Sequence, residues 1–190
     1  MLIDVYDFDG TIYDGDSTFD FVCFCALRHP EMIREFPRVC TAGISMLLRH
    51  ISLTQFKGIL FKTMAAYMDL EAEAELFWQQ EKTRGKLGAW FDRTPRDLPI
   101  VIASASPEFE LQYAAKLLGV QTLIGTQCDA RTGEMTGINC KGAQKIERIR
   151  ERIGDFTVRA MYTDDAKADA ALLEIAKERY IVTHGKVERQ

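Results

Sequence analysis

Short β-branched and aromatic runs alternate with helical patterns along most of this chain. Five runs predict strands, over residues 2–8, 99–103, 120–126, 157–162 and 180–183. Three apolar patterns with helical spacing lie between the later strands, over residues 107–118, 141–153 and 166–179. This alternation is typical of a parallel sheet. We therefore expect an α/β protein with a Rossmann-like, mostly parallel sheet and helices on both faces.

One long segment interrupts the alternation. The strand pattern stops near Tyr13 and returns only at Leu98. Four helices are predicted between these points, over residues 16–28, 31–49, 53–67 and 70–82. The strands on either side both end in polar, reactive residues, so we expect them to be neighbours in one sheet. Residues 14–94 would then form a small helical domain inserted into an α/β core made of residues 1–13 and 95–190.

Composition narrows the class of protein. The chain has 190 residues, of which 47% are hydrophobic, enough to bury the core of one domain with an insertion. Its net charge of -4 argues against a nucleic-acid-binding surface. Five cysteines, with no C-x-x-C pair, indicate a reducing compartment. We expect no leader peptide, because the first strand begins almost at the first methionine, and no apolar run approaches the ~20 residues of a membrane span. We expect a cytoplasmic monomer or homodimer without stable membrane association.

Two carboxylates end the first strand. Asp7 and Asp9 stand one residue apart in Asp-Phe-Asp-Gly-Thr, and Gly10 then allows a tight turn. The carboxyl end of a strand is where an open α/β sheet binds ligands. Both carboxylates reach one ligand only if the chain curls after Phe8, and a hard cation such as Mg2+ would make their crowding tolerable. A lone Asp-Gly surface turn is the alternative.

Three later segments carry further candidate site residues near strand ends or helix starts. A strand ends in Ser104 and is followed by Ala105, just ahead of the helix predicted over residues 107–118. Another helix begins near two lysines, Lys141 and Lys145. The last strand before the C-terminal helix runs into a cluster of three acids, Asp164, Asp165 and Asp169.

These four motifs, in this order, resemble those of the haloacid dehalogenase superfamily, and within it the phosphoserine-phosphatase-like group with a small helical cap. The resemblance covers nearly the whole chain, most firmly residues 1–18 and 98–176. It implies a Mg2+-dependent phosphatase that hydrolyses a small phosphate monoester through an aspartyl-phosphate intermediate. Asp7 would be the nucleophile and Asp9 the general acid and base. Superfamily members that break carbon–halogen bonds lack the second acid, so Asp9 favours phosphate chemistry.

The resemblance also assigns supporting roles. Mg2+ would be held by Asp7, the main-chain carbonyl of Asp9, and Asp165 or Asp164; the four-residue spacing to Asp169 favours Asp165. The phosphate would be bound by Ser104, by backbone N–H groups at Ala105 and its neighbour, and by a lysine. Lys145, followed by Ile-Glu-Arg-Ile, fits the third motif better than Lys141, which is the second candidate.

The natural substrate is less well defined. The place of the cap glutamate that contacts phosphoserine in this group is taken by Asp16, and no arginine lies between Arg49 and Arg84. Both departures argue against phosphoserine. The inserted segment is rich in Phe, Met and Trp, which suits a helical core or, in part, a pocket for a lipid-like phosphate ester. A phosphotransferase with the same intermediate, or a non-catalytic binding module on the same fold, would also be compatible with these residues.

Overall fold

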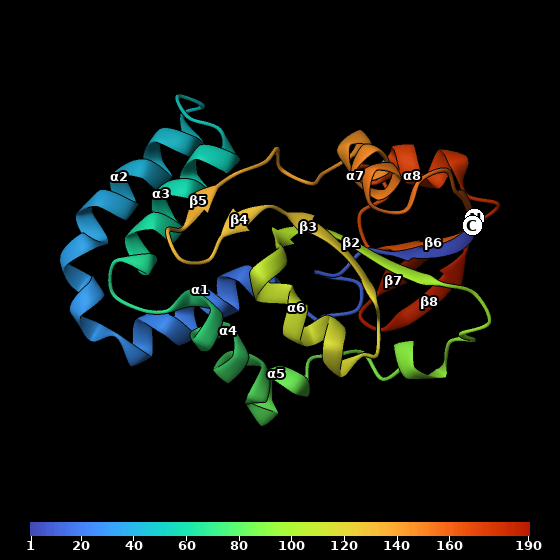
Figure 1. Cartoon of the computed structure of the whole chain (residues 1–190), viewed down its shortest axis with the longest axis horizontal. Helices are drawn as coiled ribbons and strands as arrows, with labels where there is room; N and C mark the ends of the chain where they lie inside the picture. Colours follow the sequence, from blue (N-terminus) through green and yellow to red (C-terminus); the bar gives the residue numbers. More distant parts are fainter.

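The computed structural model describes residues 1–190, and a six-stranded sheet forms its centre (Figure 1). The strands are β1 (Leu2–Tyr6), β2 (Ile100–Pro107), β3 (Thr122–Thr126), β6 (Thr157–Thr163), β7 (Glu178–Thr183) and β8 (Lys186–Arg189). Their order is β3-β2-β1-β6-β7-β8, and every neighbouring pair is parallel except the β7–β8 hairpin. The predicted mostly parallel sheet is confirmed.

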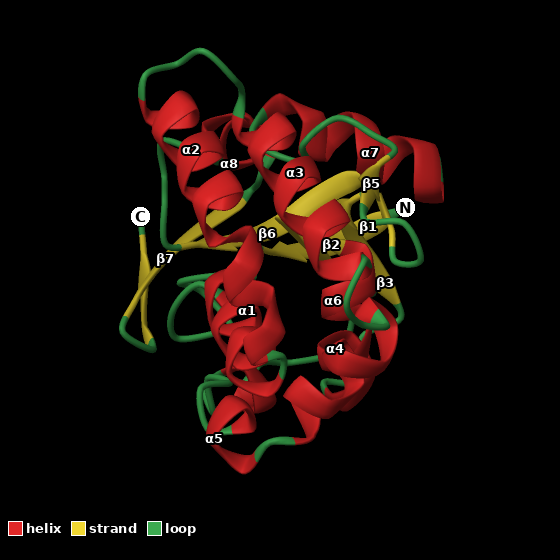
Figure 2. Ribbon diagram, turned by 90° about the vertical axis from the view of Figure 1, so that its left-hand side faces the viewer, coloured by secondary structure: helices red, strands yellow, loops and turns green.

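Helices cover both faces of the sheet (Figure 2). On one face, Ile3 and Val5 of β1 pack in a buried cluster with α7 (Ala143–Ile153) and α8 (Ala170–Ile175). Side chains alternate along a strand, so Tyr6 points to the other face, where it joins a larger cluster containing α6 (Glu108–Leu117). The α/β arrangement expected from the sequence is therefore confirmed.

The helix predicted over residues 31–49 is divided. It consists of a 3-10 helix, η1 (Pro30–Glu35), followed by α2 (Phe36–Leu47). Pro37 has no backbone N–H, so an α-helix cannot continue through it from the preceding turn, whereas it is well tolerated in a first turn. The helix predicted over residues 70–82 is likewise split into α4 (Leu70–Gln79) and α5 (Glu81–Arg84).

The C-terminal prediction is only partly right. The helix expected over residues 166–179 is shortened to α8, and β7 begins at Glu178. The edge strand β8 was not predicted, because its sequence is polar and exposed and lacks an apolar alternation. Its partner is β7, with Val182 opposite Val187.

The segment between β1 and β2 is helical throughout, with α1 (Ser17–Arg28), η1, α2, α3 (Leu53–Ala65), α4, α5 and the short η2 (Phe91–Arg93). α4 packs on α6, and the Trp78 indole donates a hydrogen bond to the Glu110 carbonyl at 2.7 Å. α2 and α3 pack on each other at one end of the molecule (Figure 1). No helix combines the length and the apolar character that crossing a bilayer requires. The domain division at residues 14 and 94 stays a prediction.

A small hairpin joins α3 to the sheet-bearing part of the chain. β4 (Cys128–Asp129) and β5 (Glu134–Met135) form an antiparallel hairpin, and β5 packs against α3. Gly133 in its turn has φ +68°, and a Cβ there would lie 2.2 Å from the main-chain carbonyl of Phe61. Only glycine allows this close approach.

Replacing Gly133 by alanine therefore tests how tightly the hairpin holds α3. Gly119→Ala is the matched control, because Gly119 has φ +67° but its nearest neighbour is the end of a flexible arginine at 3.4 Å. Both variants lose about 1–2 kcal/mol from the left-handed backbone. Gly133→Ala loses roughly 1–3 kcal/mol more through overpacking. Urea unfolding measures the difference, and equal losses in the two variants would contradict the close contact.

Candidate active site

The carboxyl ends of three central strands meet at one edge of the sheet. Tyr6 of β1 lies opposite Ile102 of β2 and Tyr162 of β6, so the residues that follow these positions are brought together. A cavity of about 610 Å³ opens there. All ten predicted site residues line it: Asp7, Asp9, Asp16, Ser104, Ala105, Lys141, Lys145, Asp164, Asp165 and Asp169.

The chain curls immediately after β1. The backbone N–H groups of Thr11 and Tyr13 both donate to the Phe8 carbonyl, at 3.2 and 2.9 Å. Gly10 has φ +73°, and a Cβ there would lie 2.2 Å from a carboxylate oxygen of Asp164. The turn thus depends on glycine at this position, and it brings Asp9 back to the same cavity as Asp7.

Lys145 connects the first and fourth motifs. Its Nζ lies 2.8 Å from Asp7 Oδ1 and 2.7 Å from Asp169 Oδ1, and only 3% of the residue is exposed. Asp169 also accepts a hydrogen bond from the Thr163 hydroxyl at 2.8 Å. Burial lowers the pKa of Lys145, but the two carboxylates outweigh burial and raise the pKa above its ordinary value. The side chain is therefore a fixed, permanent cation.

Asp7 shares this cation with Asp169. Burial raises the pKa of Asp7, and Lys145 opposes the rise.

Lys141, the second candidate lysine, is exposed at the rim of the cavity and makes no ion pair. It precedes α7, which begins at Ala143, whereas Lys145 lies in the first turn of that helix and faces the sheet.

Asp9 is held by partners on two other elements. One carboxylate oxygen accepts a hydrogen bond from the backbone N–H of Ser17, at the start of α1, at 2.7 Å. The other accepts from the hydroxyls of Ser106, at 2.6 Å, and Ser104, at 3.3 Å. The Ser104 hydroxyl in turn accepts from the Ser106 backbone N–H at 3.0 Å. The carboxylate therefore has a defined orientation toward α1 and β2.

The two candidate metal acids differ in their contacts. The hydroxyl of Thr11 donates to Asp164 Oδ1 at 3.2 Å, and Asp164 also lies against Gly10. Asp165 instead accepts hydrogen bonds from the backbone N–H groups of Ala168 and Lys167, at 2.9 and 3.0 Å, which lower its pKa. Sequence spacing favours Asp165, whereas these contacts direct Asp164 toward the first motif.

Carboxylates outnumber ammonium groups around the cavity. Six aspartates line it against three lysines, Lys57, Lys141 and Lys145, which leaves three formal negative charges. An anionic phosphate ester would need a further cation to share this space. No group of three acidic side chains is placed to hold a metal ion. A hard cation there would combine one or two carboxylates with other oxygen ligands, such as a main-chain carbonyl or water.

Two predicted residues have structural partners as well as a place at the cavity. Asp16 is the N-cap of α1, where its carboxylate accepts from the Phe19 backbone N–H at 2.8 Å. The carbonyl of Ala105 accepts hydrogen bonds from Lys57 Nζ, at 2.9 Å, and from the Thr126 hydroxyl, at 2.7 Å.

Lys57 was not among the predicted site residues. It reaches the cavity from α3, and burial lowers its pKa. Its sequence signal lies in the helical spacing of Leu53, Phe56 and Leu60, because Lys57 falls on the same face at i, i+3, i+4 and i+7. A lysine that interrupts an apolar stripe is a candidate for a buried functional group.

Sequence reasoning also missed a chain of hydroxyls that ends in a buried acid. Thr18 Oγ1 lies 3.0 Å from both Ser106 Oγ and Glu110 Oε2, and Ser106 donates to Asp9. Burial raises the pKa of Glu110 to about 8, and the charge of Asp9 adds to this rise. A neutral Glu110 can donate to Thr18, Thr18 to Ser106, and Ser106 to Asp9. Glu110 interrupts the apolar pair Phe109 and Leu111, which was the available signal.

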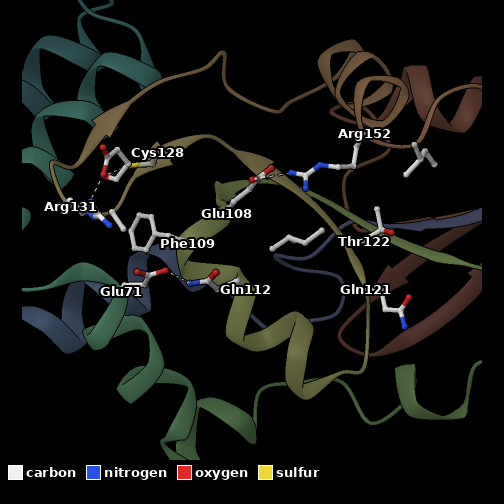
Figure 3. A pocket seen from close by; sticks show the side chains of 13 residues that line it. Glu71, Glu108, Phe109, Gln112, Gln121, Thr122, Cys128, Arg131 and Arg152 are labelled. Atoms are coloured by element: carbon white, nitrogen blue, oxygen red, sulfur yellow. Dashed lines mark hydrogen bonds and ion pairs between the residues drawn. The ribbon is translucent and has the colours of Figure 1, made fainter.

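A second cavity, of about 650 Å³, lies beside α6, β3 and the β4–β5 hairpin (Figure 3). The Glu108 carboxylate that lines it is already paired. Glu108 accepts from Arg148 and Arg152, at 3.1 and 3.5 Å, and from the Gly125 backbone N–H at 3.1 Å. None of the predicted site residues lines it.

Solved structures share this fold. A protein of unknown function from Bordetella pertussis Tohama I superposes with a TM-score of 0.74 at 21% identity, covering 94% of this chain and 88% of its own. A phosphoserine phosphohydrolase-like protein from Francisella tularensis superposes with a TM-score of 0.57 at 17% identity, covering 94% and 86%. At these identities the likeness is one of fold.

Comparison of the sequence with known proteins and with family models gives two further matches. Protein CicA of Caulobacter vibrioides is 29% identical over 206 aligned positions, which cover 97% of this chain and 88% of CicA. The model of the haloacid dehalogenase-like hydrolases matches residues 5–174, from the first strand to the acidic cluster and beyond. With its four motifs gathered at one sheet edge and this match over most of its length, the chain belongs to the haloacid dehalogenase-like hydrolase family.

Proposed function

We propose that this hydrolase is a phosphatase that cleaves a phosphate monoester through an aspartyl phosphate on Asp7. The observation that carries the proposal is the position of Lys145 between Asp7 and Asp169, with Asp9 fixed by hydrogen bonds at the same cavity. A carboxylate nucleophile needs a neighbouring cation to approach an anionic phosphoryl group, and Lys145 supplies one.

Asp7 and Asp9 have different roles in the proposed reaction. A carboxylate oxygen of Asp7 attacks phosphorus, and the bond from phosphorus to the alcohol oxygen breaks. Asp9, as the acid, gives its proton to that departing oxygen. Asp9, now the base, then takes a proton from water, which attacks the phosphorus of the aspartyl phosphate. Free phosphate leaves, and both side chains return to their starting state.

Mg2+ fits the oxygen donors of the cavity. Asp7, the main-chain carbonyl of Asp9 and the Asp164 or Asp165 carboxylate are the ligands that hard cations prefer, and the surplus of three negative charges makes a divalent cation favourable. If bound there, Mg2+ would supply positive charge to offset that of the phosphoryl group. Asp169 acts on Lys145 rather than on the phosphate, because its carboxylate is engaged with that ammonium group.

Phosphate binding falls to residues on two elements. Ser104 and Ala105 lie in the last four residues of β2 and line the cavity, where the Ser104 hydroxyl and the Ala105 backbone N–H would donate to phosphate oxygens. Lys145 neutralises charge on the attacked group, and Lys141 at the rim attracts the incoming anion. Residues 14–94 would form the cap, with Asp16, Lys57 and the α3 side chains closing the cavity over a small-molecule ester.

Asp7→Asn removes the nucleophile while preserving its shape. We expect hydrolysis of p-nitrophenyl phosphate in Mg2+ to fall by about 10⁴-fold or more, as for loss of other covalent nucleophiles. Asp14→Asn is the control, since Asp14 is exposed and does not line the cavity. Chelation of Mg2+ abolishes wild-type turnover. Equal activity of the Asp7 variant and the wild type would rule out the mechanism.

A methionine at each lysine position separates the two candidates. Lys145→Met removes the cation shared by Asp7 and Asp169 and lowers kcat by about 10²–10³-fold, the usual effect of losing a transition-state charge partner. Lys141→Met changes kcat less than tenfold. Circular dichroism checks that both variants fold. A larger loss for Lys141→Met would reverse the assignment.

The metal ligand is tested by the concentration of Mg2+ that gives half-maximal activity. Asp164→Asn raises this concentration roughly tenfold or more, a loss typical of altered metal shells. In Asp165→Asn the amide oxygen still accepts the two turn hydrogen bonds, so we expect little change. The opposite order would identify Asp165 as the ligand.

A further inference from the structure

The catalytic cavity has two chemically different ends. One end, its floor, carries the charged groups at the edge of the sheet. The other end, its wall, is formed by helices between β1 and β2. That wall contains six large apolar side chains from α1, α2 and α3: Phe19, Val22, Val39, Leu53, Phe56 and Leu60. Polar and apolar surfaces therefore belong to one continuous space of about 610 Å³, within the usual range for ligand sites.

Leu60 is a buried member of the larger hydrophobic cluster, but the other five side chains of the wall are not fully used as core. Val22, Val39 and Phe56 are only partly buried against the larger hydrophobic cluster. Phe19 is 65% exposed and Leu53 is 41% exposed, and both line the cavity. Apolar surface beside a phosphate site is unfavourable while it stays in contact with water. An apolar group of a ligand that covers this surface would remove that cost.

The charged groups of the insertion that reach this wall already have partners. The Lys57 ammonium donates to the Ala105 carbonyl, and the Asp16 carboxylate caps α1. The Lys57 stem lies on the same helix face as Leu53, Phe56 and Leu60, so it extends the apolar wall toward the phosphate site. A zwitterionic amino acid would lose much of its hydration there and gain few free partners.

We infer that the substrate is the phosphate monoester of an alcohol with an alkyl or acyl chain, whose phosphate sits at Asp7 and whose chain lies along the α1–α3 wall. This inference rests on the proposed phosphatase function and names its substrate class. Lys57 stands at the boundary, where its apolar stem extends the wall toward the phosphate site while its ammonium group stays bound to the Ala105 carbonyl.

A series of monomeric n-alkyl phosphates tests the inference, with kcat/KM measured from ethyl to octyl phosphate and compared with phosphoserine. Each added methylene that reaches the wall raises kcat/KM roughly fourfold, by the transfer of a CH2 group out of water. Phosphoserine is a poorer substrate than octyl phosphate. Equal values for ethyl and octyl phosphate, or a preference for phosphoserine, would overturn the inference and leave the phosphatase intact.

Two wall variants locate the effect. Phe56→Ala and Leu53→Gln lower the ratio of octyl to ethyl kcat/KM by about tenfold and severalfold, respectively, because each removes apolar contact with the chain. Leu53 is exposed enough that its change does not endanger folding. Phe36→Ala is the control: Phe36 begins α2 and is 64% exposed, but it does not line the cavity. An unchanged ratio in both wall variants would refute the assignment.

The series also separates this inference from the proposed function. If no phosphate ester is hydrolysed, including p-nitrophenyl phosphate in Mg2+, both fail together. If esters of every length are hydrolysed alike and the Asp7→Asn variant is inactive, only the chain-binding inference fails.

Discussion

One buried ammonium group lies between two carboxylates, and the site is organised around it. Lys145 Nζ is within 2.8 Å of both Asp7 and Asp169, which come from segments far apart in the chain. Removing one partner from a buried ion pair costs roughly 3–5 kcal/mol, so this arrangement holds α7, the end of β1 and the start of α8 in register. In the proposed mechanism the same ammonium group would prepare Asp7 for an anionic substrate, so that stability and chemistry would depend on the same contact.

The remaining parts of the site follow from the topology of the sheet. Parallel strands place the residues after β1, β2 and β6 at one edge, and the turn at Gly10 returns the chain toward Asp164. The helical segment between β1 and β2 begins after this turn, and side chains of its α1, α2 and α3 line the cavity at this edge. The β4–β5 hairpin packs against α3, with Gly133 in contact with the Phe61 carbonyl. The helices that carry the apolar wall are thereby held next to the charged floor.

Much of the fold and of the candidate site was predictable, because strands and strand ends are marked by patterns of neighbouring residues in the sequence. β-branched runs marked every parallel strand, and the ten predicted site residues reach one cavity because each stands at a strand end or a helix start. Lys57 and Glu110 were missed because their roles arise from partners that are distant in sequence. The choice between Asp164 and Asp165 was beyond the sequence for another reason: adjacent residues differ only in side-chain direction, and that is set by Gly10 and Thr11. The edge strand β8 lacked a signal because it buries nothing.

The central claim is that Asp7 carries the phosphoryl group during turnover. Rapid acid quench of the enzyme mixed with a phosphate ester and Mg2+, followed by mass spectrometry of its peptides, tests this directly. The account predicts a phosphoryl group on the peptide that contains Asp7 during steady-state hydrolysis, and none after the substrate is exhausted. An enzyme that hydrolyses the ester without any phosphorylated peptide, or with the group on another residue, would contradict it.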